Sequence, residues 1–239
     1  MGYQIAQSVA REVWALARGQ YFVVSRGQLL ALGMHPQAVK HRVSTGRLHG
    51  VHRGVYAVGR RDLSRNGELM AAVLACGQGA VLSHRSAAEL WGLGAGGSVE
   101  VTVPPGRSPK RPGIRVHRRE LDRAHVIPWH EIPVTTPVRT LVDMASHLPR
   151  DHLERAVNEA DRLDLIDPEA LREALDGFVW QPGVGKLRTL LDRRTFTFTD
   201  SALERQAHSP GCRAAQAAHP NNGSMAFAST SSGRSLDWW

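Results

Sequence analysis

The sequence predicts an α+β protein with an N-terminal winged helix-turn-helix, a middle α+β domain and a disordered C-terminal remnant. Three observations lead to this prediction. Residues 24–58 have the pattern of two short helices followed by a hairpin, and residues 62–176 alternate helical periodicity with short β-prone runs. After residue 206 hydrophobic periodicity ends.

The helix-turn-helix rests on capping and breaking residues. Ser25 and Gln28 have the spacing of a capping box, which opens a short helix that Gly33 ends. Pro36 suits the first position of a second helix, and Gly46 closes it. Two short helices joined by a tight turn are typical of the DNA-binding motif whose second helix enters the major groove.

The next segment predicts the wing. Leu48–Val51 and Val55–Val58 are β-prone runs on either side of His52, Arg53 and Gly54. We expect a hairpin with a basic tip.

Before the helix-turn-helix, apolar residues recur at helical spacing and predict a further helix that ends near Gly19. Trp14 and Tyr21 have apolar neighbours, so we expect core residues rather than base-stacking ones.

Positive charge is concentrated in the same segment. Residues 1–61 carry nine Lys and Arg against one acid, Glu12, whereas the other 178 residues are balanced, so the whole net charge of +8 lies here. The nine are Arg11, Arg18, Arg26, Lys40, Arg42, Arg47, Arg53, Arg60 and Arg61. Such a patch neutralises DNA phosphates. The alternative is a solvated, arginine-rich surface without a partner.

In the middle segment, helices are expected at 63–76 and within 80–93. Ser83 caps the second, with Ala87, Leu90 and Trp91 inward and His84 in an exposed first turn. Because no nucleophile or metal-ligand pattern accompanies His84, we interpret it as a surface or hydrogen-bonding residue rather than a catalytic one.

Residues 98–103 and 114–117 are expected to pair as a hairpin across a loop rich in Pro and Gly. Arg107, Lys110 and Arg111 make this loop basic, either as a second phosphate contact or as a solvated tip. A strand at 132–135, a helix opened by Thr136 and Pro137, and helices from about 153 and 167 complete the segment. Because this middle segment shows no catalytic pattern, we expect it to serve in interaction or dimerisation.

Composition excludes other classes. No basic start precedes an apolar run, and no stretch approaches about 18 uninterrupted apolar residues, so we expect neither secretion nor a membrane span. Cys76 and Cys212 lie in unlike contexts. We therefore expect a cytoplasmic protein without disulfides.

Three motifs, in order, resemble AbiEi antitoxins of type IV toxin-antitoxin systems. They are RGVYAVG (53–59), AVLSHRSAAELWGL (80–93) and VTTPVRTLVDMA (134–145), and the resemblance covers about residues 5–176. It implies a winged helix that binds double-stranded operator DNA and a following domain that helps to neutralise a nucleotidyltransferase toxin. The resemblance implies neither an enzymatic activity nor a cofactor. It does not predict the operator sequence or the oligomeric state.

The resemblance also gives the expected DNA-binding positions. On the second helix, Gln37, Lys40, His41 and Ser44 would face the groove. The flanking residues Ser25, Arg26, Arg47, His52 and Arg53 complete the set, the last three facing the DNA backbone or minor groove.

Residues 184–206 are similar to the entry into a nuclease domain related to very-short-patch-repair endonucleases, of the PD-(D/E)xK class. Glu204 matches the helix glutamate of that class, which joins carboxylates on adjacent strands to hold Mg²⁺. One carboxylate cannot hold Mg²⁺, so we expect Glu204 to be vestigial, the chain to lack nuclease activity, and Mg²⁺ to bind only an intact relative.

The expected boundaries are 1–61, 62–176, 177–206 and a disordered tail, 207–239. Codons can be chosen for residues 225–239 so that the frame starting one nucleotide earlier contains Val-Asp-Phe, similar to the metal-binding strand of that nuclease family. The hypothesis is a frameshift, real or a sequencing error.

Two alternatives to the regulator therefore stay open: a truncated, inactive nuclease relative carrying a winged helix, and a module that binds an acidic protein.

Overall fold

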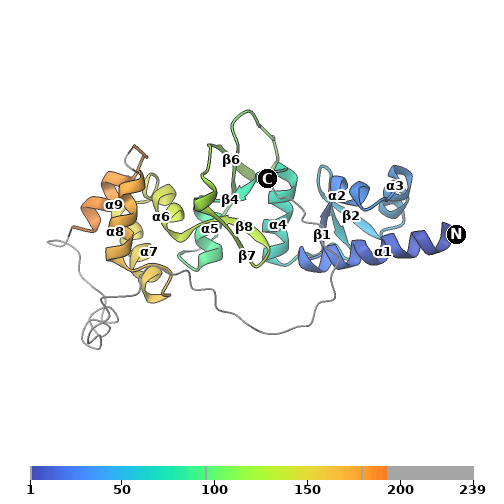
Figure 1. Ribbon diagram of the computed structural model, residues 1–239, viewed down its shortest axis with the longest axis horizontal. Helices are drawn as coiled ribbons and strands as arrows, with labels where there is room; N and C mark the ends of the chain where they lie inside the picture. The colour runs from blue at the N-terminus through green and yellow to red at the C-terminus, as the bar shows by residue number, and fades with distance from the viewer. Residues whose placement is uncertain (1, 95, 179, 193–239) are drawn as a thin grey trace. The chain divides into compact units, whose positions relative to one another are not determined.

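The computed structural model describes residues 2–94, 96–178 and 180–192 (Figure 1). Glu204, the expected nuclease entry beyond residue 192, the tail and the frameshift lie outside the described residues. Within them, no helix is both long enough and apolar enough to cross a membrane.

The first elements form a winged helix. They are α1 (Gly2–Gly19), β1 (Val23–Ser25), α2 (Arg26–Ala31), α3 (Pro36–Ser44), β2 (Leu48–His52) and β3 (Val55–Val58). The predicted helix pair and hairpin are confirmed. No residue pattern predicted β1, which pairs antiparallel with β3 and makes a three-stranded sheet of order β1-β3-β2.

Both faces of this small sheet are buried. Val24 and Leu48 pack into the core of α1, α2 and α3, which also holds Leu29 and Val39. On the other face, Val23 packs with residues of α4 (Arg65–Cys76). The wing is therefore held from both sides.

Helix α4 lies between two sheets. It contacts β1, β2 and β3 of the wing and also β4, β5 and β8 of the second sheet. This explains why most of the helix is buried, from Gly67 to Cys76, since an amphipathic helix would leave one face to water. At Gly67 an added Cβ would meet the Tyr21 carbonyl oxygen at 3.2 Å, so glycine permits the close approach of the chain.

The second sheet has five strands in the order β6-β5-β4-β8-β7. They are β4 (Val81–Leu82), β5 (Val99–Val103), β6 (Ile114–Arg118), β7 (Val126–Trp129) and β8 (Ile132–Thr135).

The expected hairpin of β5 and β6 is wrong, because these strands pair in parallel, Val99 opposite Ile114. The loop 104–113 must therefore return from the end of β5 to the start of β6, a distance equal to the length of a five-residue strand, about 16 Å. Arg111 fixes the loop by donating from Nε to the carbonyl oxygen of Ala75 at 2.9 Å, so this arginine is engaged within the fold.

Helices cover the face of this sheet away from α4. Helix α5 (His84–Trp91) packs on β5 and on α6 (Pro137–Ala145), whose N-cap Thr136 and first-turn proline are confirmed.

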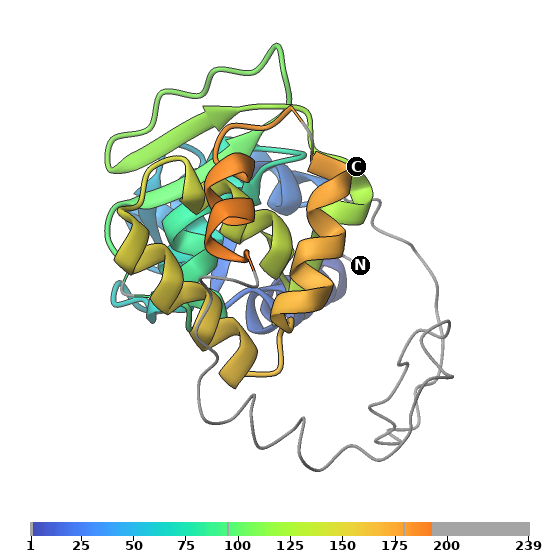
Figure 2. The same ribbon diagram turned by 90° about the vertical axis from the view of Figure 1, so that its left-hand side faces the viewer.

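Helices α7 (Arg150–Arg162) and α9 (Val184–Leu190) contact α6, and α8 (Pro168–Ala174) contacts the 3-10 turn η2 (Leu175–Phe178) (Figure 2). A second 3-10 turn, η1 (Arg123–His125), precedes β7. Helix α9 lies in the segment assigned to the nuclease entry and packs on α6 and α7. The domain boundaries stay predictions.

The prediction that Trp14 is a core residue is wrong. Its side chain is 46% exposed, because it lies at the open side of the winged helix with its ring edge-on to Phe22 and near the backbone of Gly59. Tyr21 is half-buried, and its hydroxyl donates to the carbonyl oxygen of His130 at 2.9 Å.

Candidate nucleic-acid interface

The start of α2 is a complete capping box. The Ser25 hydroxyl oxygen accepts from the backbone N–H of Gln28 at 3.1 Å, and the backbone N–H of Ser25 donates to Gln28 Oε1 at 2.8 Å. The cap uses the Ser25 oxygen as an acceptor, so its hydroxyl proton can still be donated to a phosphate.

Helix α3 is anchored on one side and exposed on the other. Pro36 occupies its first turn, and the His35 ring nitrogen Nδ1 accepts from the backbone N–H of Gln37 at 3.2 Å. Val39 is 2% exposed and packs into the core. The predicted groove-facing side chains are all exposed: Gln37, Lys40, His41 and Ser44.

These four positions follow the helical repeat over two turns, about 10 Å of helix, which fits the width of a B-DNA major groove. Their chemistry differs. Gln37 offers an amide that can bond an adenine edge, and Lys40 offers a charge. The Ser44 hydroxyl donates to the His41 carbonyl oxygen at 2.9 Å, so toward DNA it can act only as an acceptor.

The wing turn lies beside α2. Gly54 has φ +81°, and its carbonyl oxygen accepts from the backbone N–H of Arg26 at 2.7 Å. The side chains of Arg26 and Arg53 are both exposed. Two cations are thus presented at the junction of the helix pair and the wing.

His52 is placed differently from the other predicted residues. It is half-buried, and burial, followed by the charge of Arg111, lowers its pKa below the usual value of 6.5. A neutral, half-buried imidazole is a weaker phosphate ligand than the charged, exposed side chains of Arg26 and Arg53.

Arg47 is exposed and follows the end of α3, where its backbone N–H donates to the Arg42 carbonyl oxygen at 2.8 Å. Arg42 was not among the predicted site residues. The two arginines line a pocket with Trp14 and Leu48, of about 410 Å³.

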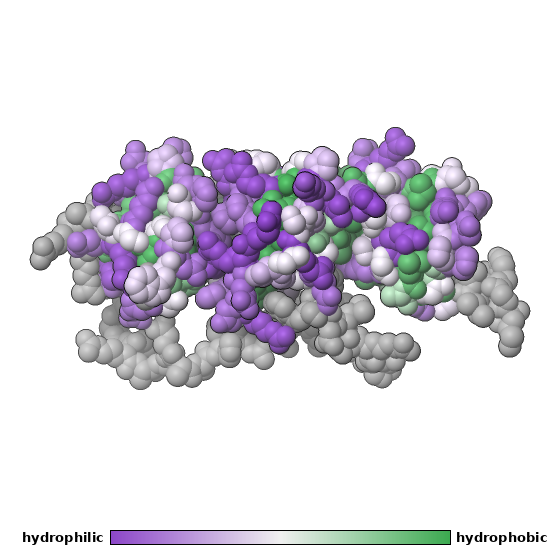
Figure 3. All heavy atoms as spheres, turned by 90° about the horizontal axis from the view of Figure 1, so that it is seen from above, coloured by the Kyte–Doolittle hydropathy of each residue, from purple (hydrophilic) through white to green (hydrophobic). Residues whose placement is uncertain are grey.

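The positive charges of the winged helix are not neutralised by neighbouring carboxylates. Within the described part of the chain, no carboxylate forms a salt bridge with any of the nine lysine and arginine residues of 1–61. Arg60 instead lies over the Phe22 ring, 5.4 Å from its centroid. The face seen in Figure 3 is mostly hydrophilic, with narrower hydrophobic bands. An unneutralised cationic surface is what phosphate binding requires.

Residues 11–59 match a protein family described as "Transcriptional regulator, AbiEi antitoxin". This segment resembles AbiEi antitoxins. The match spans the winged helix from within α1 to the residue after β3 and supports a DNA-binding, antitoxin-like role. The description is that of a regulator, not an enzyme.

Among solved structures, the chain is similar to "Crystal structure of RV2827C protein from Mycobacterium tuberculosis". The identity is 20% over 78% of this chain and 76% of that chain, with a TM-score of 0.47. A likeness at this level carries no argument about function. No curated protein matches the chain.

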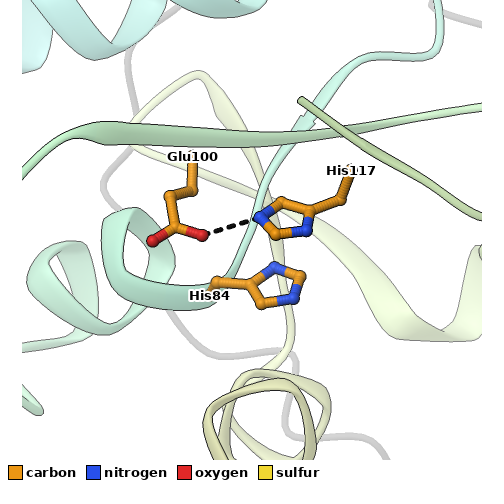
Figure 4. A group of neighbouring side chains, drawn as sticks. All are labelled: His84, Glu100 and His117. Atoms are coloured by element: carbon orange, nitrogen blue, oxygen red, sulfur yellow. Dashed lines mark hydrogen bonds and ion pairs between the residues drawn. The ribbon is translucent and has the colours of Figure 1, made fainter. Parts of the chain in front are cut away.

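The structure also assembles a polar cluster that the sequence interpretation missed. His117 Nε2 lies 2.7 Å from Glu100 Oε2, and the His84 ring stacks on the His117 ring with 3.7 Å between centroids and 11° between planes (Figure 4). The expectation of an exposed His84 is wrong, because the residue is half-buried. Glu100, a carboxylate between valines in the buried strand β5, was the signal that could have indicated this cluster.

Behind it lies a buried ion pair. Arg139 and Asp143 are one helical turn apart on α6, and the Arg139 guanidinium donates to both Asp143 carboxylate oxygens at 2.7 and 3.3 Å. Both side chains are 2% exposed. The arginine and the aspartate of the motif VTTPVRTLVDMA are therefore buried residues that pair with each other inside the fold.

Proposed function

We propose that the protein is a DNA-binding transcriptional regulator of the antitoxin type, whose winged helix binds double-stranded operator DNA. The observation that carries the proposal is the exposed face of α3, with Gln37, Lys40, His41 and Ser44, on a module whose cations have no carboxylate partners among the described residues. The family match of residues 11–59 supports it.

The roles of the site residues follow from their chemistry. Gln37 and His41 carry hydrogen-bonding groups for base edges, while Lys40 and Ser44 flank them on the same face of α3. Arg26, Arg47 and Arg53 bind phosphates on either side of the helix. Ser25 contributes its hydroxyl proton near the N-terminus of α2. In this proposal the chain itself has no enzymatic activity.

The test is binding of the full chain to the DNA upstream of its own gene, followed by fluorescence anisotropy over a salt series. A regulator that neutralises phosphates loses affinity linearly in a double-logarithmic plot against salt concentration. It also prefers its own upstream DNA to a scrambled duplex of equal length. Equal affinity for the two duplexes would contradict operator recognition.

We further propose a nucleotidyltransferase toxin as the protein partner, with residues 62–176 contributing to its neutralisation. The test is co-purification of the full chain with the product of an adjacent gene of that kind. Failure of such a pair to associate would contradict the toxin assignment and leave DNA binding unaffected.

The truncated nuclease stays a prediction from the resemblance of residues 184–206. Resequencing the locus tests it, because a frameshift predicts that nuclease coding continues downstream in another frame. Cleavage of DNA by the frame-restored protein with Mg²⁺, abolished by Glu204→Ala, would establish the alternative. A locus without such a frame would exclude it.

A further inference from the structure

Two pockets adjoin beside the stacked histidines. They measure about 550 and 210 Å³ and share His84, Asp143 and His147 in their walls. The larger also has residues of β6 and α6 in its lining, and the smaller has Arg85 and Arg115. We call the two together the trough, a space within the size range of small-ligand sites.

The trough is rich in cations. Its lining includes two carboxylates, Glu100 and Asp143, against five arginines: Arg85, Arg115, Arg118, Arg119 and Arg139. The lining is therefore positively charged even with every histidine neutral.

Both carboxylates are already engaged. Asp143 accepts from buried Arg139 and also lies 3.4 Å from Arg119 Nη1. Glu100 is held by His117, and its pKa is lowered: burial opposes this shift, but the hydrogen bond from His117 and nearby positive charges outweigh it. Glu100 and Asp143 therefore interact with side chains inside the trough. They form no salt bridge with Arg85 or Arg118.

Arg115 is exposed too, but its charge acts on Glu100 and helps to lower the pKa of that carboxyl, which leaves two exposed arginines for a ligand. Arg85 lines the smaller pocket and Arg118 the larger, both are exposed, and neither forms a salt bridge with any carboxylate that the structure describes. Guanidinium groups in this position are suited to phosphate, whose oxygens match their paired N–H donors.

The first turn of α5 adds backbone donors. Ser83 is the N-cap residue but makes no side-chain cap hydrogen bond. Its hydroxyl instead lies 3.0 Å from His84 Nδ1 and accepts from Thr102 Oγ1 at 2.8 Å. The Ser86 N–H donates to the Ser83 carbonyl oxygen at 3.2 Å, whereas the Ser83 hydroxyl caps neither the His84 nor the Arg85 N–H, and a helix N-terminus favours an anion.

His84 is held in a strained conformation at this point. Its φ is +51°, a region that costs a non-glycine residue about 1–3 kcal/mol and persists where the surroundings enforce it. Stacking on His117 and the contact with Ser83 enforce it here. Such strain commonly accompanies ligand sites.

A divalent cation fits this geometry less well. Ligand atoms of His84, Glu100 and His117 lie within 4.8 Å of one another, the spacing of a metal site. Imidazole lone pairs lie in the ring plane, however, and two rings stacked with nearly parallel planes cannot both direct a nitrogen at one ion about 2 Å away. The surrounding arginines also repel a cation.

We propose that the trough binds a phosphate-bearing ligand of mononucleotide size through Arg85, Arg118 and the first turn of α5. The proposal is independent of the winged helix.

Isothermal titration of the full chain with inorganic phosphate, AMP and ADP tests it. We expect saturable binding, weakened about tenfold by Arg85→Ala and by Arg118→Ala, the effect of losing one charge-assisted contact. Arg155→Ala is the matched control, because this exposed arginine on α7 does not line the trough. Circular dichroism checks that each variant is folded.

Comparing inorganic phosphate with AMP and ADP distinguishes a site for free phosphate from a site for a nucleotide. Equal affinity for the three probes supports a free phosphate site, and tighter binding of AMP or ADP supports a nucleotide site. The proposal is overturned by absence of saturable binding, by binding that both trough variants retain, or by Zn²⁺ binding at the histidines without phosphate binding.

Discussion

The backbone N–H of Arg26 donates to the carbonyl oxygen of Gly54 at 2.7 Å, which fixes the first residue of α2 against the wing turn. Arg26 and Arg53 are therefore positioned by one hydrogen-bonded junction. Because α4 covers the opposite face of the wing sheet, this junction belongs to a rigid module.

Arg53→Ala should weaken binding of all duplexes by a similar factor, because a phosphate contact carries no sequence information. We expect the slope of the double-logarithmic salt plot to fall by about 1. Anisotropy with the upstream duplex and a scrambled duplex measures both quantities, and Arg155→Ala on α7 is the control. Loss confined to the upstream duplex would contradict a phosphate role.

Gln37→Ala should instead reduce specificity. Losing a paired hydrogen bond to a base edge costs about 1–3 kcal/mol of discrimination and leaves the salt slope nearly unchanged. Competition between upstream and scrambled duplexes measures the change. An unchanged preference would show that Gln37 does not contact a base.

Ser25→Ala should destabilise the winged helix by about 1 kcal/mol, because it leaves the Gln28 N–H without its cap. Urea unfolding followed by circular dichroism measures this. Ser25→Thr keeps a capping hydroxyl and serves as the control. Equal unfolding midpoints for the Ala and Thr variants would contradict the structural role of the cap.

Asp143→Leu should destabilise the fold by about 3–5 kcal/mol, because it leaves the guanidinium of Arg139 buried without its counterion. The double variant Arg139→Leu/Asp143→Leu should be less destabilised than this single variant, since it buries no unpaired charge. Urea unfolding of the parent, the single variants Arg139→Leu and Asp143→Leu, and the double variant completes the cycle. Additive losses would contradict the coupling.

Stability should fall as the pH is lowered from about 6.5 to 4. Burial, followed by the charges of His117 and His147, lowers the His84 pKa to about 4, against the opposing attraction of Asp143 and Glu100. Between these pH values the unfolded chain binds a proton at His84 that the folded chain does not, which favours unfolding by up to about 3 kcal/mol. Below pH 4 this contribution levels off.

Unfolding measured across this range, with His84→Asn for comparison, tests the effect. His52 and His125 also have lowered pKa values and act in the same direction, so the difference between parent and variant isolates His84. A pH dependence that the variant retains in full would contradict the assignment to His84.

Local chemistry was sufficient to predict the winged helix. The Ser25 capping box, Pro36 and the turn at Gly54 each depend on neighbours a few residues away, and each lies where expected. The same holds for the helix starts at Thr136 and Asp167.

Long-range arrangements were not predictable. A loop rich in Pro and Gly suits a hairpin and a parallel return equally, so the β5–β6 pairing could not be inferred. The cluster of His84, Glu100 and His117 forms only when separate elements meet. Trp14 has apolar neighbours in the sequence, yet its side chain is 46% exposed in the fold.

The most direct test of the account is the affinity of the full chain for its own upstream DNA as salt is raised from 50 to about 200 mM. With about four phosphate contacts, from Arg26, Lys40, Arg47 and Arg53, we predict a loss of about 10²-fold, and a shallower dependence for Arg53→Ala. Absence of binding at the lowest salt concentration would contradict the central claim that the cationic winged helix binds DNA.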